Sequence, residues 1–177
     1  MKKIKTKIKD LINLKGNTYF DYRGFLREAF KVKHINKRII FSIVSKSKKN
    51  VIRGLHFQSK NPQDKLIIVL KGKILDVAID LRKNSKTFGH TFSIILSSMN
   101  AKGLYIPAGF AHAYYSYEKE NIIYYKLDNY YSPKFESGIV YNDTDIKINW
   151  PRKNMLISKK DKNLKSFKEF KKIYKYL

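Results

Sequence analysis

Residues 66–81, LIIVLKGKILDVAIDL, decide the fold class of this chain. Two apolar runs flank the turn sequence KGK at 71–73, and both have the short length and branched aliphatic content of strands. In the second run, alternation places Asp76 and Asp80 on one face of an extended chain and Val77 on the other. The stretch therefore predicts two strands joined by a tight turn.

Short runs of the same kind lie on both sides of this stretch, with turn residues between them. No helical periodicity separates the runs between residues 51 and 150, so we expect an antiparallel sandwich or jelly roll. The flanking segments are TYFDYRGFLREAF (18–30), expected as a strand, a turn and a strand, RIIFSIVS (38–45), HTFSIILS (90–97), LYIP (104–107), FAHAYYSY (110–117) and IIYYKLDNYY (122–131).

The pattern changes after Trp150. In LKSFKEFKKIYKYL, Leu164, Phe167, Ile173, Tyr174 and Leu177 recur near helical spacing with lysines between them. We expect a short amphipathic helical tail at about 158–177 that packs on the β domain; a location on a membrane surface is the alternative. The length of 177 residues suits one domain over 1–177.

Composition excludes several classes of protein. The chain has no cysteine, so a disulfide scaffold and a thiolate nucleophile are excluded. Its formal charge of +24 would attract nucleic acid, but the lysines are spread along the whole sequence, so no specific nucleic-acid partner is expected. Asp10 and Lys15 interrupt the basic N-terminal segment, and no apolar run is long enough to span a membrane. A cytoplasmic location, without membrane association, is the expectation.

Two of the four histidines are candidates for chemistry. His56 in RGLHFQ and His112 in PAGFAHAYY each follow a short turn that contains glycine, whereas His34 and His90 lie among polar residues and are expected at the surface. Histidines in a β-rich domain first suggest a metal site. Position 58 is Gln, however, and no second metal ligand follows His56 closely, so no metal is expected.

A series of seven motifs resembles one enzyme family, the dTDP-4-dehydrorhamnose 3,5-epimerases. They occur in the order and with the spacing typical of that family, and the resemblance covers about residues 15–161. The motifs are NVIRGLHFQ (50–58), QDKL (63–66), KGKILDVAIDLR (71–82), SKTFG (85–89), LYIPAGFAHA (104–113), YYKLDNYYSP (124–133) and YNDTDIKINWP (141–151).

The resemblance implies a mainly β cupin fold, a double-stranded β-helix or jelly roll, and an epimerase that needs no cofactor and forms a homodimer. Such enzymes act on nucleotide-linked 4-keto-6-deoxy sugars, in which the C4 carbonyl acidifies the protons at C3 and C5. Inversion needs a base on one face of the sugar and an acid on the other. Histidine suits the base because its pKa lies near neutrality.

By motif position, His56 resembles the family's base and Tyr125 resembles its acid. Asp161 resembles the carboxylate that orients the histidine, and Lys65 resembles the group beside the enolate oxygen. The residues that stand at the family's substrate-contact positions are Arg23, Glu28, Arg53, His112 and Tyr131.

Several of these residues have a plain structural alternative. His56 suits a buried, hydrogen-bonded histidine. Tyr124 and Tyr125 point to opposite faces of the same expected strand, and composition cannot choose between them. Ser158 and Asp161 also form the pattern of a helix capping box. Asp76 and Asp80 are omitted from the catalytic set, as charges that offset local lysines.

Phe41 and Ile43 depart from the family pattern, because amide side chains are common at these two positions. Loss of polar contacts changes discrimination between substrates. The thymidine-linked sugar is the leading hypothesis and a guanosine-linked 4-keto-heptose for capsule synthesis the alternative, with C3, C5 or both as the inverted centres. A non-catalytic nucleotide-sugar-binding cupin and a 3,4-ketoisomerase are the hypotheses from other classes; Lys65 and the RGLHFQ context weigh against the ketoisomerase.

Overall fold

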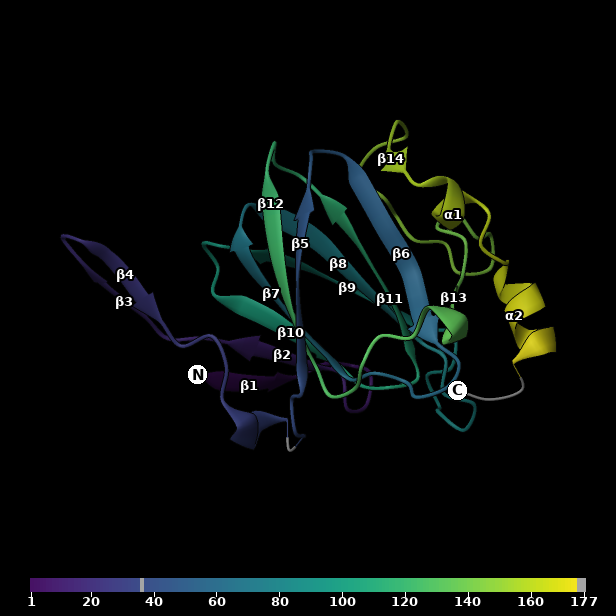
Figure 1. Cartoon of the computed structure of the whole chain (residues 1–177), viewed down its shortest axis with the longest axis horizontal. Helices are drawn as coiled ribbons and strands as arrows, with labels where there is room; N and C mark the ends of the chain where they lie inside the picture. Colours follow the sequence, from purple (N-terminus) through teal and green to yellow (C-terminus); the bar gives the residue numbers. More distant parts are fainter. Residues whose placement is uncertain (36, 175–177) are drawn as a thin grey trace.

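The computed structural model describes residues 1–35 and 37–174, and two antiparallel sheets dominate it (Figure 1). The first sheet has the order β1 (Lys2–Lys5), β2 (Ile12–Lys15), β10 (Lys102–Ile106), β7 (Lys65–Lys71), β12 (Asn121–Leu127) and β5 (Phe41–Ser47). The second has the order β13 (Glu136–Gly138), β6 (Val51–Gln58), β11 (Phe110–Ser116), β8 (Lys73–Asp80) and β9 (Thr91–Ser97), and β14 (Leu156–Ile157) joins β6 in parallel.

The two sheets pack face to face around an apolar core, as expected of a jelly roll. Ile67 and Ile123 from the first sheet meet Ile74, Ala78 and Phe110 from the second, and all five are almost completely buried. The predicted strands at 66–70 and 74–81 are β7 and β8, joined at Gly72, whose φ of +83° lies in the left-handed region that glycine favours. The expected mainly β fold is confirmed.

The C-terminal tail forms two short helices where the sequence predicted one. They are α1 (Lys159–Lys162) and α2 (Phe167–Ile173), and each begins at a serine N-cap. Phe167 and Phe170 pack on the outer face of the second sheet, whereas Ile173 is 53% exposed. The predicted contact of Leu177 lies outside the described residues.

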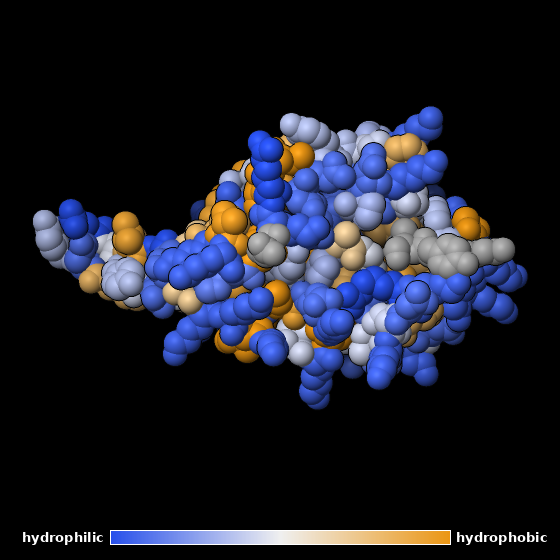
Figure 2. All heavy atoms as spheres, turned by 90° about the horizontal axis from the view of Figure 1, so that it is seen from below, coloured by the Kyte–Doolittle hydropathy of each residue, from blue (hydrophilic) through white to orange (hydrophobic). Residues whose placement is uncertain are grey.

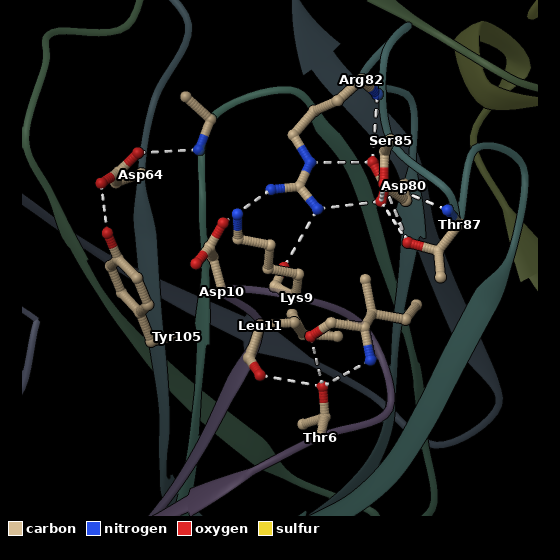
Figure 3. A network of polar contacts seen from close by, with 12 residues as sticks. Thr6, Lys9, Asp10, Leu11, Asp64, Asp80, Arg82, Ser85, Thr87 and Tyr105 are labelled. Carbon is tan, nitrogen blue, oxygen red and sulfur yellow. Dashed lines mark hydrogen bonds and ion pairs between the residues drawn. The ribbon is translucent and has the colours of Figure 1, made fainter.

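One arginine links the turn between β1 and β2 to the end of β8 (Figure 3). Arg82 donates to the buried Asp80 carboxylate at 2.9 Å, to Asp10 at 3.1 Å and to the carbonyl oxygen of Lys9 at 3.0 Å. The hydroxyl groups of Ser85 and Thr87 also donate to Asp80. The expectation that Asp80 offsets lysines was therefore wrong, since a fully buried carboxylate requires a closer set of donors.

The hairpin of β3 (Thr18–Asp21) and β4 (Gly24–Arg27) projects away from the sandwich (Figure 1). It confirms the predicted strand, turn and strand. Its apolar side chains are largely exposed: Tyr19 by 57%, Phe20 by 69%, Phe25 by 54% and Leu26 by 71%. The hairpin thus gains little from burial within its own chain.

Two 3-10 turns, η1 (Val32–His34) and η2 (Pro133–Phe135), complete the described elements. No helix among the described residues is both long and apolar enough to cross a membrane. Hydrophilic residues extend across the face in Figure 2 and do not gather over one element, as the dispersed lysines predict.

Candidate active site

A pocket of about 670 Å³ opens between the two sheets. Inward-facing side chains of β5, β7 and β12 form one wall, those of β6 and β11 form the other, and the segment 156–161 borders it. A volume of this size suits a ligand larger than a single sugar ring. Seven of the nine predicted site residues line it: Arg53, His56, Lys65, His112, Tyr125, Tyr131 and Asp161.

His56 on β6 is held by a carboxylate. Its Nε2 lies 2.7 Å from Oδ1 of Asp161, whose side chain is 5% exposed. The pKa of Asp161 lies below its ordinary value: burial opposes this shift, but hydrogen bonds, above all that to His56, outweigh it. A carboxylate can only accept, so Nε2 carries a proton and Nδ1 is left as the basic nitrogen.

Asp161 also has the position that the capping pattern predicts. The Ser158 hydroxyl accepts a hydrogen bond from the Asp161 backbone N–H at 3.0 Å, which begins α1. The carboxylate of Asp161 then points to β6, where it also accepts from the Gly54 backbone N–H at 3.3 Å. The capping and pairing interpretations are therefore compatible, because the cap uses the backbone of Asp161 and the histidine its side chain.

Tyr125 on β12 faces the pocket, and its neighbour Tyr124 faces the other way. The Tyr124 hydroxyl donates to Ser42 at 3.2 Å on the outer side. Burial raises the pKa of Tyr125 well above its ordinary value, and Arg53 partly opposes this. Tyr125 therefore stays protonated until a strong base is formed beside it.

Lys65, at the start of β7, lies half-buried in the pocket wall. Burial lowers the pKa of its ammonium group to about 8, against the attraction of Glu136 and Asp76. A half-buried cation of this kind can stabilise negative charge that develops on a substrate oxygen.

Asp76 contacts the pocket residue His112 from behind the pocket wall, a position that the sequence interpretation missed. It is fully buried on β8 and its Oδ1 lies 2.5 Å from Nε2 of His112, while its Oδ2 has no hydrogen-bond partner among the described residues. The expectation that it only offsets lysines was wrong. Alternation along β8 gave no signal for it, because residues on both faces of that strand are buried.

Glu136 and Lys160 were also missed. Glu136 Oε1 lies 3.8 Å from Nδ1 of His56, and its Oε2 accepts from the hydroxyl of Tyr131 at 2.5 Å and pairs with Lys160. This hydrogen bond, together with burial, raises the pKa of Tyr131 to about 12. Both missed residues lie in elements of three or four residues, β13 and α1, which are too short for sequence periodicity to give a signal.

The two remaining predicted residues lie outside this pocket. Arg23, at the tip of the hairpin, pairs with Asp21 at 2.6 Å and is 74% exposed. Glu28 pairs with the N-terminal ammonium group at 2.5 Å and with Lys31. Their predicted roles stay predictions.

Ile43 and Phe41, the two residues that depart from the family pattern, lie in different surroundings. Ile43 lines the pocket, on the strand beside Tyr125. Phe41 does not line it and packs against Tyr130, with ring centroids 5.7 Å apart. Within the described residues, no three His, Asp or Glu side chains are arranged to hold a metal ion.

Comparisons with known proteins agree on one family. A family model described as dTDP-4-dehydrorhamnose 3,5-epimerase matches residues 5–169. A relative of that name from Methanothermobacter thermautotrophicus is 40% identical over 174 residues, covering 94% of this chain and 94% of the relative.

Solved structures give the same result. A dTDP-6-deoxy-D-glucose-3,5-epimerase from Legionella pneumophila, in complex with dTDP-4-keto-L-rhamnose, is 37% identical with a TM-score of 0.90, covering 93% of this chain and 92% of that one. A dTDP-4-dehydrorhamnose 3,5-epimerase from Bacillus anthracis, with TDP and PPi bound, is 38% identical with a TM-score of 0.90, covering 94% and 99%.

Proposed function

This chain belongs to the dTDP-4-dehydrorhamnose 3,5-epimerase family and is an epimerase, and from that premise we propose that His56 and Tyr125 carry out the proton transfers. One observation carries the proposal. A histidine paired with a carboxylate and a half-buried, protonated tyrosine belong to the two facing sheets and line the same pocket. Inversion requires a base and an acid on opposite faces of the substrate, and this arrangement supplies both.

His56 begins the reaction by removing the proton at C3 or C5 through its Nδ1. The bond from Nε2 to Asp161 fixes the ring and stabilises the imidazolium that forms. Electrons from the broken C–H bond delocalise onto the C4 oxygen, where the Lys65 ammonium group stabilises the enolate. Tyr125 then protonates the same carbon from the opposite face, which inverts it.

The substrate is a sugar linked to a nucleoside diphosphate. Arg53 lines the pocket and its guanidinium suits a phosphate group. The ligands named for the Legionella pneumophila and Bacillus anthracis structures support thymidine as the nucleoside. A guanosine-linked 4-keto-heptose is the alternative, because the apolar Ile43 lines the pocket where the family pattern has an amide.

A second copy of this chain completes the substrate site in this proposal. Arg23 and Glu28 lie outside the pocket of their own chain, and the projecting hairpin bears four exposed apolar side chains. Burial of such side chains drives association between protein surfaces. A homodimer in which each hairpin packs on its partner would bring Arg23 towards the partner pocket, where it would bind diphosphate.

For the chain as a whole, the proposal keeps the two expectations from the sequence, a single domain and a cytoplasmic location. A single domain over 1–177 is supported by the family match from residue 5 to residue 169. A cytoplasmic location is supported by the absence of cysteine, since disulfides are typical of oxidising compartments.

Hydrogen exchange tests the proposed reaction. The protein is incubated in D2O with thymidine-linked and, separately, guanosine-linked 4-keto-6-deoxy sugars, and NMR follows deuterium at C3 and C5. We expect incorporation and inversion with the thymidine-linked sugar. Incorporation with the guanosine-linked sugar alone would favour the alternative substrate, and no incorporation with either would favour a binding protein without catalysis.

A further inference from the structure

Gln58 on β6 is a buried amide that lines the pocket, and the proposed reaction gives it no role. It is 5% exposed and lies two residues after His56, so both side chains face the pocket. Its Nε2 donates to the carbonyl oxygen of Tyr130 at 3.4 Å, and its Oε1 accepts from the backbone N–H of Ser132 at 2.6 Å. One amide therefore holds the backbone on both sides of Tyr131.

Only one orientation of the amide satisfies these contacts. A carbonyl oxygen only accepts and a backbone N–H only donates, so Nε2 must face Tyr130 and Oε1 must face Ser132. The Nε2 group also donates to the carbonyl oxygen of Asn61 at 2.8 Å. Both hydrogens of the amide are thus used, which fixes the direction of the Gln58 side chain.

The segment 128–132, which follows β12, depends on such side chains for its hydrogen bonds. It lies between β12 and η2, so its backbone is not part of a sheet ladder. Gln63, which is 8% exposed, donates from its Nε2 to the carbonyl oxygen of Asn129 at 2.9 Å. Two buried glutamines thus restrict the backbone from 129 to 132, which would otherwise be free to adopt several conformations.

Tyr131 takes its position from this backbone. Its side chain is 44% exposed, so packing constrains it only weakly. Its hydroxyl donates to Oε2 of Glu136 at 2.5 Å, and Glu136 lies directly opposite Gln58 where β13 pairs with β6. Cross-strand partners point to the same face of a sheet, so the phenol is brought to the wall of the pocket that carries His56.

We propose that Gln58 is a positioning residue that acts through Tyr131, fixing the phenol where it contacts the bound nucleotide sugar. The inference rests on the proposed function, in which Tyr131 is a substrate contact and His56 is the base. Gln58 and His56 belong to one strand, so the distance between the base and the phenol is set within a few residues. A substrate held by Tyr131 keeps its reacting carbon near Nδ1 of His56, and displacement of the phenol slows proton removal.

A purely structural role for Gln58 predicts a different result. Loss of its hydrogen bonds would then lower the melting temperature of the protein, because buried backbone groups would lose their partners. The activity of the folded protein would not depend on whether Gln58 and Tyr131 are present together. The two roles therefore differ in the coupling between these two residues.

A double-mutant cycle measures that coupling. Gln58→Met keeps the length of the side chain and removes its hydrogen bonds, Tyr131→Ala removes the phenol, and a third chain combines both changes. NMR measures kcat/KM for epimerisation of the thymidine-linked 4-keto-6-deoxy sugar. We expect Q58M to lower kcat/KM about tenfold in the unmodified chain. In the Y131A background the loss should be less than about twofold, because the residue through which Gln58 acts is already absent.

Asn100→Ala is the matched control. Asn100 holds a turn in the same way, since its Nδ2 donates to the carbonyl oxygen of Ile95 at 2.9 Å and its Oδ1 accepts from the backbone N–H of Lys102 at 3.0 Å. The turn joins β9 to β10 and does not line the pocket. N100A should therefore lower the melting temperature and leave kcat/KM unchanged.

Two results of the cycle would overturn the inference: an equal loss from Q58M in both backgrounds, and no loss in either. Should Q58M not fold, Gln58→Glu keeps the shape of the side chain and removes its donors. Its charge acts on His56 in both backgrounds, so the cycle cancels that effect, and the same two results would overturn the inference.

The single variants identify a failure of the premise. Y131A with unchanged kcat/KM would refute Tyr131 as a substrate contact and the inference with it. No epimerisation by the unmodified protein would refute the proposed reaction. Reduced kcat/KM in Y131A without coupling to Q58M would refute only the role of Gln58.

Discussion

The pocket and the projecting hairpin both contain residues assigned to one site, and they differ in what surrounds them. In the pocket, Asp161 holds His56, and Tyr125 is half-buried against the core of the same chain. On the hairpin, Arg23 contacts its near neighbours Asp21 and Tyr22, and the apolar side chains around it are exposed. The difference supports the proposal that the pocket of one chain carries the chemistry and that Arg23 acts on the pocket of a second copy.

The largest effect is expected at the base. His56→Ala removes the only group in the proposal that takes the substrate proton, so we expect exchange and inversion to fall about 10³-fold or more. His90→Ala is the control, because His90 is exposed at the surface. NMR in D2O measures both rates, and exchange that persists unchanged in H56A would refute the base assignment.

Tyr125→Phe should separate the two halves of the reaction. Without the acid we expect inversion to fall about 10²-fold while His56 continues to exchange the proton that it removes. Tyr124→Phe removes a phenol from the adjacent position on the outer face and should leave inversion unchanged. If Y124F and Y125F behave alike, the burial of Tyr125 has no catalytic consequence.

The hairpin should affect binding and not the chemical step. Arg23→Ala should raise KM roughly 10- to 100-fold with little change in kcat, since a hydrogen bond to a charged group contributes about 1.5–3 kcal/mol. Arg152→Ala removes another exposed arginine and serves as the control. Steady-state kinetics distinguish the two, and a fall in kcat alone would place Arg23 in the chemical step instead.

The smallest effect concerns pH. Lys65 must be protonated to stabilise the enolate, so activity should fall as pH rises through its pKa of about 8. Asp76 raises that pKa, so Asp76→Asn should shift the falling limb of the pH–rate profile to lower pH, by less than about one unit. Asp145→Asn removes an exposed carboxylate and should not move the limb. An upward shift in D76N would contradict the assignment of the limb to Lys65.

Sequence alone predicted the residues whose position follows from strand alternation. The opposite faces of Tyr124 and Tyr125 are an example, because a strand of known register fixes the direction of each side chain. It could not place Asp76, since both faces of β8 are buried and alternation does not tell which one borders the pocket.

Two further features depend on tertiary structure that no local pattern encodes. Glu136, on the short strand β13, reaches His56 and Tyr131, and Lys160, on the short helix α1, reaches Glu136. The direction of the β3–β4 hairpin depends on packing outside its own sequence. Motif position therefore predicted Arg23 at the substrate site, although it lies outside the pocket of its own chain.

Mixed dimers test the central claim most directly. The H56A and R23A chains are co-expressed in equal amounts, purified together and assayed at low substrate concentration against each variant alone. If Arg23 acts on the partner pocket, each mixed dimer has one intact site, and activity should recover to roughly a quarter of the unmodified enzyme, because about half of the dimers are mixed. Activity no greater than the average of the two separate variants would show that Arg23 and His56 do not act across the two chains.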